Sequence, residues 1–219
     1  VLVVSARSSG ERCEEAGISM FALPLDTPGV HVTGYRTLDG LRGADVRFDA
    51  VEVPVAALLG EAGAGWDILE ACADHGAGLL CAEALGAMEA LFDATLDYLR
   101  TRQQFGVPIG NSRALRDGIA GMLIHLEQPR SIPIVGSVRL DGDDAAERRR
   151  VVSAAKYRVG QAARFIGQQA VQLHGGMGVT DELAAAHYFK RLSMIELTLG
   201  DRDHHLARFI AQPGFQEAA

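Results

Sequence analysis

The feature that most constrains the fold is an uninterrupted helical pattern between Trp66 and about Arg102. Apolar residues recur there at steps of three and four, which places them on one face of a helix. The stripe consists of Leu85, Met88, Phe92, Leu96 and Leu99. A helix of this length predicts a bundle or a helical interface, because its apolar face needs a partner.

Further helical segments follow this one. A second pattern runs from about Ser112 into the 130s, where Pro129 and Pro133 predict a kink or a break. An interior proline removes a backbone hydrogen bond, which disfavours a continuous helix.

A third helix is expected to end near His174, with Gly175 as a left-handed cap. The run ERRR at 147–150 is interpreted as its solvated start. A short helix near 182–192 and a last helix over about 201–211 complete the pattern. The C-terminal part of the chain is thus predicted to be helical almost throughout.

Residues 1 to about 60 carry strand signals instead. The runs VLVVSA and GISMFALPL are rich in residues that favour strands, and DTPGVHV predicts a turn. The stretch ADVRFDAVEVP alternates, with a break at Asp49–Ala50 that a bulge or turn would produce. These short strands predict a fragment of an antiparallel sandwich or barrel.

The Gly-rich stretch LLGEAGAGW separates the strand signals from the helical part. We therefore expect two domains, residues 1–60 and residues 61–219. The strand pattern is already under way at Val1, which suggests that the chain is the C-terminal part of a longer one.

Composition excludes several classes of protein. The formal net charge of -7 argues against a nucleic-acid-binding protein, because a phosphate backbone attracts basic surfaces. Cys13, Cys72 and Cys81 have no metal-ligand spacing, so we expect reduced thiols in a cytoplasmic protein. No apolar run approaches the roughly 20 residues that a membrane span needs.

The stretch QLHGGMGVTDE, residues 172–182, has three glycines within four residues. An esterase-type oxyanion loop would need a G-x-S-x-G elbow, which this sequence lacks. Alternatively, glycine backbone N–H groups can cradle a phosphate, and Gln172 would add an amide donor. A plain helix cap explains Gly175 equally well, so the residues alone leave the two readings open.

The histidines do not form a metal-binding pattern. No H-E-x-x-H motif or Cys-rich spacing accompanies them. We expect no metal site, and interpret these four as surface or capping residues: His174, His187, His204 and His205.

Two segments together carry a resemblance to a known family. RTRQQFGVPIG, residues 100–110, QLHGGMGVTDE and the spacing between them resemble the acyl-CoA dehydrogenase flavoproteins. LDTPGVHV, VRFDAVEVP and LLGEAGAGW resemble the second half of that family's middle β-domain. The resemblance implies an α+β, mostly α fold, with a partial antiparallel β-domain followed by a four-helix up-down bundle.

The resemblance also implies a cofactor, FAD, bound at a subunit interface. It assigns FAD binding to Arg102, Phe105, Gln172, Gly175 and Gly176. An arginine can grip pyrophosphate oxygens, and a phenylalanine can form an apolar wall. The alternatives are core packing for Phe105 and a plain surface charge for Arg102.

The catalytic base departs from the family pattern. The position of the family's commonest base is Leu199 here, and the alternative position on the first bundle helix is near Gly76. Neither side chain can abstract a proton. Asp201 is a weak substitute, and its alternative role is a helix N-cap. Asp74 and Glu196 are the other acids nearby.

Two functions are therefore expected from the resemblance. One is an FAD-dependent acyl-CoA dehydrogenase of lipid or steroid catabolism, which forms a 2-enoyl-CoA and passes electrons to an electron-transfer flavoprotein. The other is a catalytically silent, FAD-binding subunit that lacks the usual glutamate. Either would belong to a homo- or hetero-tetramer of related chains. The sequence does not indicate which acyl chain is the substrate.

Overall fold

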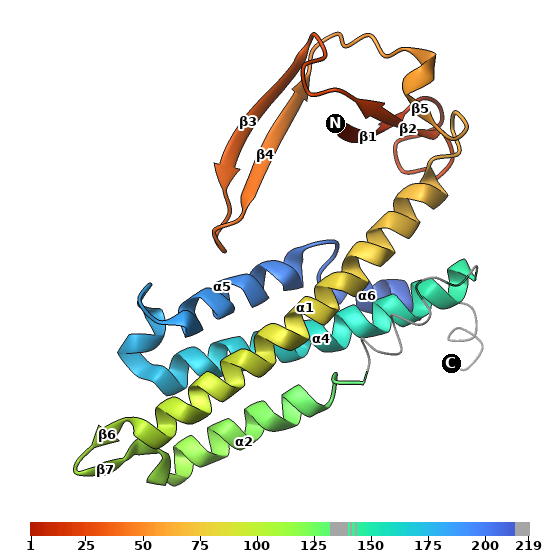
Figure 1. Cartoon of the computed structure of the whole chain (residues 1–219). Coiled ribbons are helices and arrows are strands. Elements are labelled where there is room, and N and C mark those ends of the chain that lie inside the picture. Colours follow the sequence, from red (N-terminus) through yellow and green to blue (C-terminus); the bar gives the residue numbers. More distant parts are fainter. Residues whose placement is uncertain (132–139, 141, 143, 213–219) are drawn as a thin grey trace. The chain divides into compact units, whose positions relative to one another are not determined.

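The structure is a computed structural model that describes residues 1–131, 140, 142 and 144–212. The chain splits into two compact units, Val1–Ala73 and Asp74–Ala219 (Figure 1). The first unit holds small antiparallel sheets and the second is helical, which confirms the expected α+β, mostly α class. None of the described helices combines the length and apolar character needed to cross a membrane.

The first unit contains two antiparallel sheets. One has three strands in the order β1 (Leu2–Arg7), β2 (Ile18–Leu23) and β5 (Leu58–Leu59). The other pairs β3 (Val30–Arg36) with β4 (Arg42–Phe48). The alternating pattern breaks where expected: β4 ends at Phe48, and Ala50 has a φ of 46° in the bend that follows. A short 3₁₀ turn, η1 (Val55–Ala57), precedes β5.

The helices of the second unit run alternately in opposite directions (Figure 1). They are α1 (Trp66–Thr101), whose residues 66–73 belong to the first unit, α2 (Arg113–Glu127), α4 (Ala145–His174) and α5 (Ala184–Leu197), followed by the shorter α6 (Arg202–Ile210). The long helix predicted from Trp66 is confirmed to within one residue. The predicted short helix near 182–192 proves longer, because α5 continues to Leu197.

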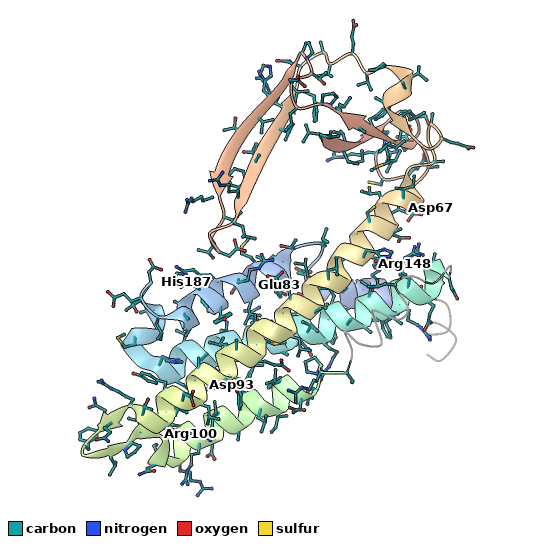
Figure 2. The ribbon with its side chains drawn as sticks, in the orientation of Figure 1. Asp67, Glu83, Asp93, Arg100, Arg148 and His187 are labelled. Carbon is teal, nitrogen blue, oxygen red and sulfur yellow. The ribbon has the colours of Figure 1, made fainter. Side chains whose placement is uncertain are left out.

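The core of the bundle contains two residues of the stripe predicted for the first helix, Met88 and Leu99, whereas the other three are only partly buried. Met88 and Leu91 of α1, Met122 of α2 and Ile166 of α4 are fully buried in one cluster. Each such side chain contributes about 2 kcal/mol when removed from water. The cluster therefore ties the four long helices into one body. Across its rim, Glu83 of α1, labelled in Figure 2, forms an ion pair with Arg191 of α5, with an N–O distance of 2.6 Å.

The helix ends agree with the sequence in part. The expected break near Pro129 is confirmed, since α2 ends at Glu127; Pro133 lies outside the described residues. Asp144 caps α4 by accepting hydrogen bonds from the backbone N–H groups of residues 146 and 147. The left-handed cap predicted at Gly175 is wrong in detail. Its φ of 59° is accompanied by a ψ of -138°, a conformation open to glycine alone.

Candidate functional site

The two segments that carry the glycine and arginine motifs lie at the same end of the bundle. The ring of Tyr98, one turn from the end of α1, lies 4.5 Å from the ring of His174 at the end of α4. The Tyr98 hydroxyl donates to the His174 carbonyl oxygen at 3.4 Å. Arg102 follows Tyr98 by one helical turn, and Gln172 precedes His174 by two residues. The two motifs are therefore neighbours in space.

A small hairpin follows α1 at this end. The strands β6 (Gln103–Gln104) and β7 (Val107–Pro108) are joined by Phe105 and Gly106, with φ values of 55° and 81°. Two positive φ values in a two-residue turn are typical of the primed turns of β-hairpins. The turn leaves the Phe105 side chain fully exposed, at 102% of its reference area. The alternative of core packing for Phe105 is therefore wrong.

Arg102 is anchored by its backbone and exposed at its side chain. Its N–H donates to the Tyr98 carbonyl at 2.9 Å, and its own carbonyl accepts from the N–H of Ile109 at 2.8 Å. Within the described part of the chain, no carboxylate pairs with its guanidinium. The side chain is thus positioned and available to an anion, although a plain surface charge would look the same.

The glycines of the loop differ in what they permit. A Cβ at Gly175 or Gly176 would meet no described atom within 4 Å, so the backbone there is open. A Cβ at Gly178 would lie 2.5 Å from the Val171 carbonyl oxygen, so that glycine serves close packing. Gln172 is exposed beside them. The loop after α4 therefore presents an open backbone and an amide side chain, which fit a phosphate-bearing ligand. This loop begins with a 3₁₀ turn, η3 (Gly175–Val179).

The two positions at which the resemblance leads us to expect a base lie side by side. A Cβ at Gly76 of α1 would lie 2.7 Å from Leu199 Cδ1. Leu199 sits in the turn between α5 and α6 and has a φ of 58°, which is unusual for a residue with a side chain. Leucine therefore takes up the space beside Gly76, and neither position supplies a proton acceptor.

The nearby acids are engaged elsewhere. Asp201 caps α6 by accepting the N–H of His204 at 2.8 Å, and this bond lowers the pKa of its carboxyl. Asp74 is buried, and its two oxygens accept from the Arg208 guanidinium at 2.6 and 3.1 Å. Glu196 accepts weakly from the N–H of Arg202 at 3.4 Å. These hydrogen bonds and ion pairs weigh against all three carboxylates as the catalytic base. The predicted helix N-cap at Asp201 is confirmed.

The Asp74 cluster corrects one interpretation of the sequence. Arg148, which Figure 2 shows on α4, is 12% exposed at its side chain, and its Nε lies 3.5 Å from Asp74. The run ERRR is therefore not wholly solvated. Its first arginine belongs to a buried ion-pair cluster in which the Ser153 hydroxyl also accepts from Arg208. Nothing local in the sequence marks this pairing, because the partners come from α1, α4 and α6.

Two of the four histidines are buried, which corrects their expected surface or capping role. His174 is 4% exposed, with Nδ1 2.8 Å from the Ala170 carbonyl oxygen, and His205 is 2% exposed. His187 and His204 are the less buried members of the set. Within the described residues, no three His, Cys, Asp or Glu side chains gather to hold a metal ion.

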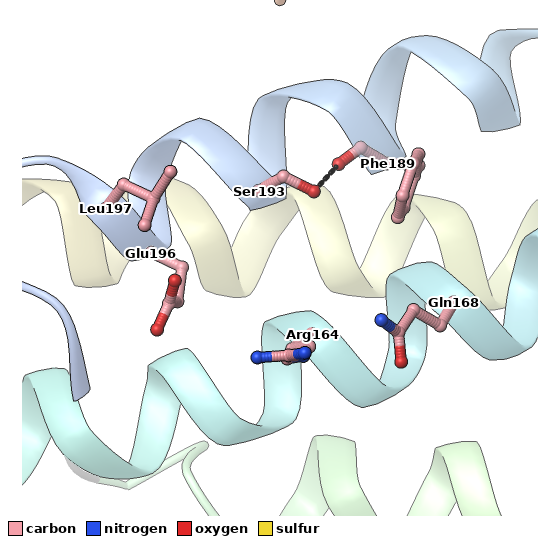
Figure 3. Close-up of a pocket in the computed structure, with 6 residues that line it drawn as sticks. All are labelled: Arg164, Gln168, Phe189, Ser193, Glu196 and Leu197. Carbon is pink, nitrogen blue, oxygen red and sulfur yellow. Dashed lines mark hydrogen bonds between the residues drawn. The ribbon is translucent and has the colours of Figure 1, made fainter. Parts of the chain in front are cut away.

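A shallow pocket of about 200 Å³ lies between α4 and α5 (Figure 3). Its lining residues are Arg164, Gln168, Phe189, Ser193, Glu196 and Leu197. Its lining includes one positive group, Arg164, and one negative group, Glu196. Leu197, at its rim, lies two residues before Leu199. None of the expected cofactor-binding residues lines it, so it is separate from the hairpin and the glycine loop.

Comparisons with known proteins place these features in a family. The model of the acyl-CoA dehydrogenase C-terminal domain matches residues 63–212. The human mitochondrial short-chain specific acyl-CoA dehydrogenase is 28% identical over 196 residues, which are 88% of this chain and 47% of that protein. The chain thus spans about half the length of the curated relatives it matches.

Solved structures agree with the sequence matches. A putative acyl-CoA dehydrogenase from Mycobacterium smegmatis is 25% identical with a TM-score of 0.89, covering 98% of this chain and 56% of that one. A chain described as the electron transferring flavoprotein of Acidaminococcus fermentans is 26% identical with a TM-score of 0.85. That match covers 94% of this chain and 55% of the other.

Proposed function

The chain belongs to the acyl-CoA dehydrogenase family, whose C-terminal half it covers, and on this basis we propose an FAD-dependent activity for its assembled protein. The reaction would be the α,β-dehydrogenation of an acyl-CoA thioester to a 2-enoyl-CoA. Bound FAD would supply the hydride acceptor, at flavin N5. An electron-transfer flavoprotein would be the acceptor of the electrons, which accords with the similarity to the Acidaminococcus protein.

The observation that carries the cofactor proposal is the pairing of Tyr98 with His174. It supports grouping five residues, which we call the cofactor end: Arg102, Phe105, Gln172, Gly175 and Gly176. Arg102 would bind pyrophosphate oxygens through charge-assisted hydrogen bonds. The open backbone at Gly175 and Gly176 would allow a close approach, and Phe105 would cover an apolar part of the cofactor.

The exposure of Phe105 supports a shared site. A fully exposed aromatic ring gains the most from contact with another surface. We propose that the cofactor end reaches FAD held mainly by a second, related chain in a homo- or hetero-tetramer. The assignment of residues 1–60 to a partial middle β-domain and of 61–219 to the bundle domain belongs to this proposal, as do a cytoplasmic location and a role in lipid or steroid catabolism.

A second candidate function follows from the contact between Gly76 and Leu199. Because leucine fills the space at both base positions, this chain would be a catalytically silent subunit. Its role would be to hold FAD and complete the assembly around a related chain that carries the base. The assembled protein would still be an acyl-CoA dehydrogenase.

The test uses the full-length protein, purified alone and together with a base-bearing homologous chain. We expect yellow protein, and bleaching of the flavin by acyl-CoA substrates in the assembly. Bleaching only in the mixed assembly supports the silent role. Bleaching by the chain alone that is abolished by Asp201→Asn and kept in part by Asp201→Glu would instead identify Asp201 as the base. Asparagine preserves the helix cap, so its effect separates catalysis from capping. Absence of flavin in every preparation would refute the proposed function.

A further inference from the structure

We infer that Lys156 and His205 are positioning residues that clamp the turn Thr198–Gly200 and thereby fix the side chain at position 199 against Gly76. The catalytic meaning of this position rests on the proposed function. The clamp itself rests on the contacts alone. Because these contacts are to backbone carbonyls, the clamp would hold the turn in the same way with any side chain at position 199.

Lys156 supplies most of the clamp. It comes from α4, is 2% exposed and ends among backbone carbonyls. Its Nζ, with three N–H donors, lies within hydrogen-bond distance of four carbonyl oxygens: those of Ile195 at 2.7 Å, Glu196 at 3.2 Å, Thr198 at 2.7 Å and Gly200 at 3.1 Å. The last carbonyls of a helix lack partners within the helix, and a positive charge suits that end of its dipole. Lys156 thus ends α5 and holds both sides of the turn.

The environment of Lys156 explains why this contact is strong. An ammonium group is costly to bury unless it is well hydrogen-bonded. Burial lowers the pKa of Lys156, while the charges of Glu196 and Asp201 oppose the shift. The side chain forms no ion pair with a described residue, so the carbonyl oxygens are its direct partners. Loss of the ammonium would leave several buried acceptors unsatisfied.

His205 holds the remaining carbonyl of the turn. It comes from α6, is 2% exposed, and its Nε2 lies 3.0 Å from the Leu199 carbonyl oxygen. That oxygen requires a donor, so Nε2 carries the proton. The carbonyls of residues 198, 199 and 200 are consequently all held by two buried side chains from different helices.

The conformation of Leu199 shows that the clamp acts against a local preference. A left-handed conformation costs a residue with a side chain about 1 kcal/mol or more. Such residues persist where the surroundings determine them strongly, often at functional sites. The next residue is equally constrained, because a Cβ at Gly200 would lie 2.5 Å from the His204 ring. The turn therefore directs the side chain at 199 toward Gly76, whatever that side chain is.

The decisive experiment is a double-mutant cycle on the free energy of unfolding of the full chain. It combines Lys156→Met with Leu199→Gly, because glycine adopts a positive φ without strain. If Lys156 holds the strained turn, its loss lets the turn relax and releases the strain of Leu199. Lys156→Met should therefore raise the unfolding equilibrium constant about fivefold less in the wild type than in the Leu199→Gly background, which has no such strain to release. Lys156→Arg, which keeps the charge and donors, should retain most of the stability. Additive effects would overturn the clamp.

Matched variants keep the test decisive. Lys190 of α5 pairs with Asp181, so Lys190→Met should be additive with Leu199→Gly. If Lys156→Met does not fold, the same cycle with His205→Leu replaces it, since it removes the donor to Leu199. In that cycle too, additivity would refute the proposal. Faster amide hydrogen exchange at Gly200 in the clamp variants should accompany the coupling.

A catalytic arm separates this inference from the proposed function. Leu199→Glu places a carboxylate at the clamped position, and we expect acyl-CoA-dependent flavin reduction to appear or rise at least about tenfold in the assembly. Lys156→Arg should preserve that gain. A coupled cycle without any gain in flavin reduction would support the clamp and count against the proposed reaction.

Discussion

Leu199 Cδ1 lies 2.7 Å from the point where Gly76 would carry a Cβ, so the two positions at which the resemblance leads us to expect a base lie side by side. In most helix interiors, replacing glycine by alanine stabilises by roughly 0.5–1 kcal/mol. At Gly76 the added methyl group meets Leu199 instead. The Leu199 side chain is partly exposed and can move aside, so we expect Gly76→Ala to forfeit the usual gain and leave the free energy of unfolding, measured by urea denaturation, near or below the wild-type value.

Gly86 is the matched control for this prediction, because it lies in the same helix and a Cβ there would meet nothing within 4 Å. Gly86→Ala should raise the free energy of unfolding by about 0.5–1 kcal/mol. Adding Leu199→Ala should make Gly76→Ala favourable. Equal stabilisation at both glycines in the wild-type background would contradict the contact.

Phe105 offers a way to separate stability from binding. Its φ of 55° suits asparagine better than phenylalanine, and Asn-Gly is a preferred sequence for this kind of turn. We expect Phe105→Asn to raise the free energy of unfolding of the isolated chain by about 0.5–1 kcal/mol. The same variant should lose FAD faster on dilution. Val107→Thr, on the adjacent strand, should change neither property strongly.

Arg102→Ala tests the grip on pyrophosphate. A charge-assisted hydrogen bond contributes about 1.5–3 kcal/mol, so we expect FAD affinity to fall on the order of tenfold to a hundredfold with little change in thermal stability. Arg100, at the same helix end and 3.8 Å from Asp97, is the control. The flavin content after gel filtration provides the measurement. Wild-type retention in Arg102→Ala would refute the assignment.

The stability of the bundle should depend on the pH through His205. Burial lowers the pKa of His205 from 6.5 to about 4. Its Nδ1 is buried without a partner among the described residues, so a second proton there would find no acceptor. The unfolded chain takes up this proton as the pH falls below 6.5, whereas the folded chain does so only near pH 4. Acidification within that window therefore favours unfolding.

We expect this difference to remove about 2 kcal/mol of stability between pH 7 and pH 5. His205→Gln should flatten the dependence, because glutamine does not titrate and keeps a donor. His204→Gln, at the exposed neighbouring position, should leave the slope nearly unchanged. Denaturation curves at several pH values measure the effect, and equal slopes in wild type and His205→Gln would contradict it.

The sequence predicted the parts of the fold that depend on local pattern. The stripe through Met88 and Leu99 identified α1, and Asp201 was recognised as a candidate helix N-cap. It did not predict the hairpin at Phe105, because an aromatic residue with a positive φ has no local signal. Nor did it reveal the partners of Arg148, which depend on how three helices pack.

The candidate site shows the same division. The motifs around Arg102 and Gln172 indicated the candidate cofactor-binding residues. That the two motifs lie at the same end of the bundle follows only from the contact between Tyr98 and His174. The roles of Lys156 and His205 were not predicted, because their partners are backbone carbonyls. Every residue has one, so the sequence does not show which of them a side chain contacts. The contact between Gly76 and Leu199 likewise joins distant parts of the chain and became evident only in three dimensions.

The burial of Cys81 gives the protein a built-in reporter. Cys81 is 1% exposed within the bundle, and burial raises its pKa to about 12, whereas Cys13 and Cys72 are exposed. An alkylating reagent needs the thiolate and access to it. Two thiols should therefore be labelled at once, and labelling of the third would count the molecules whose helices have come apart.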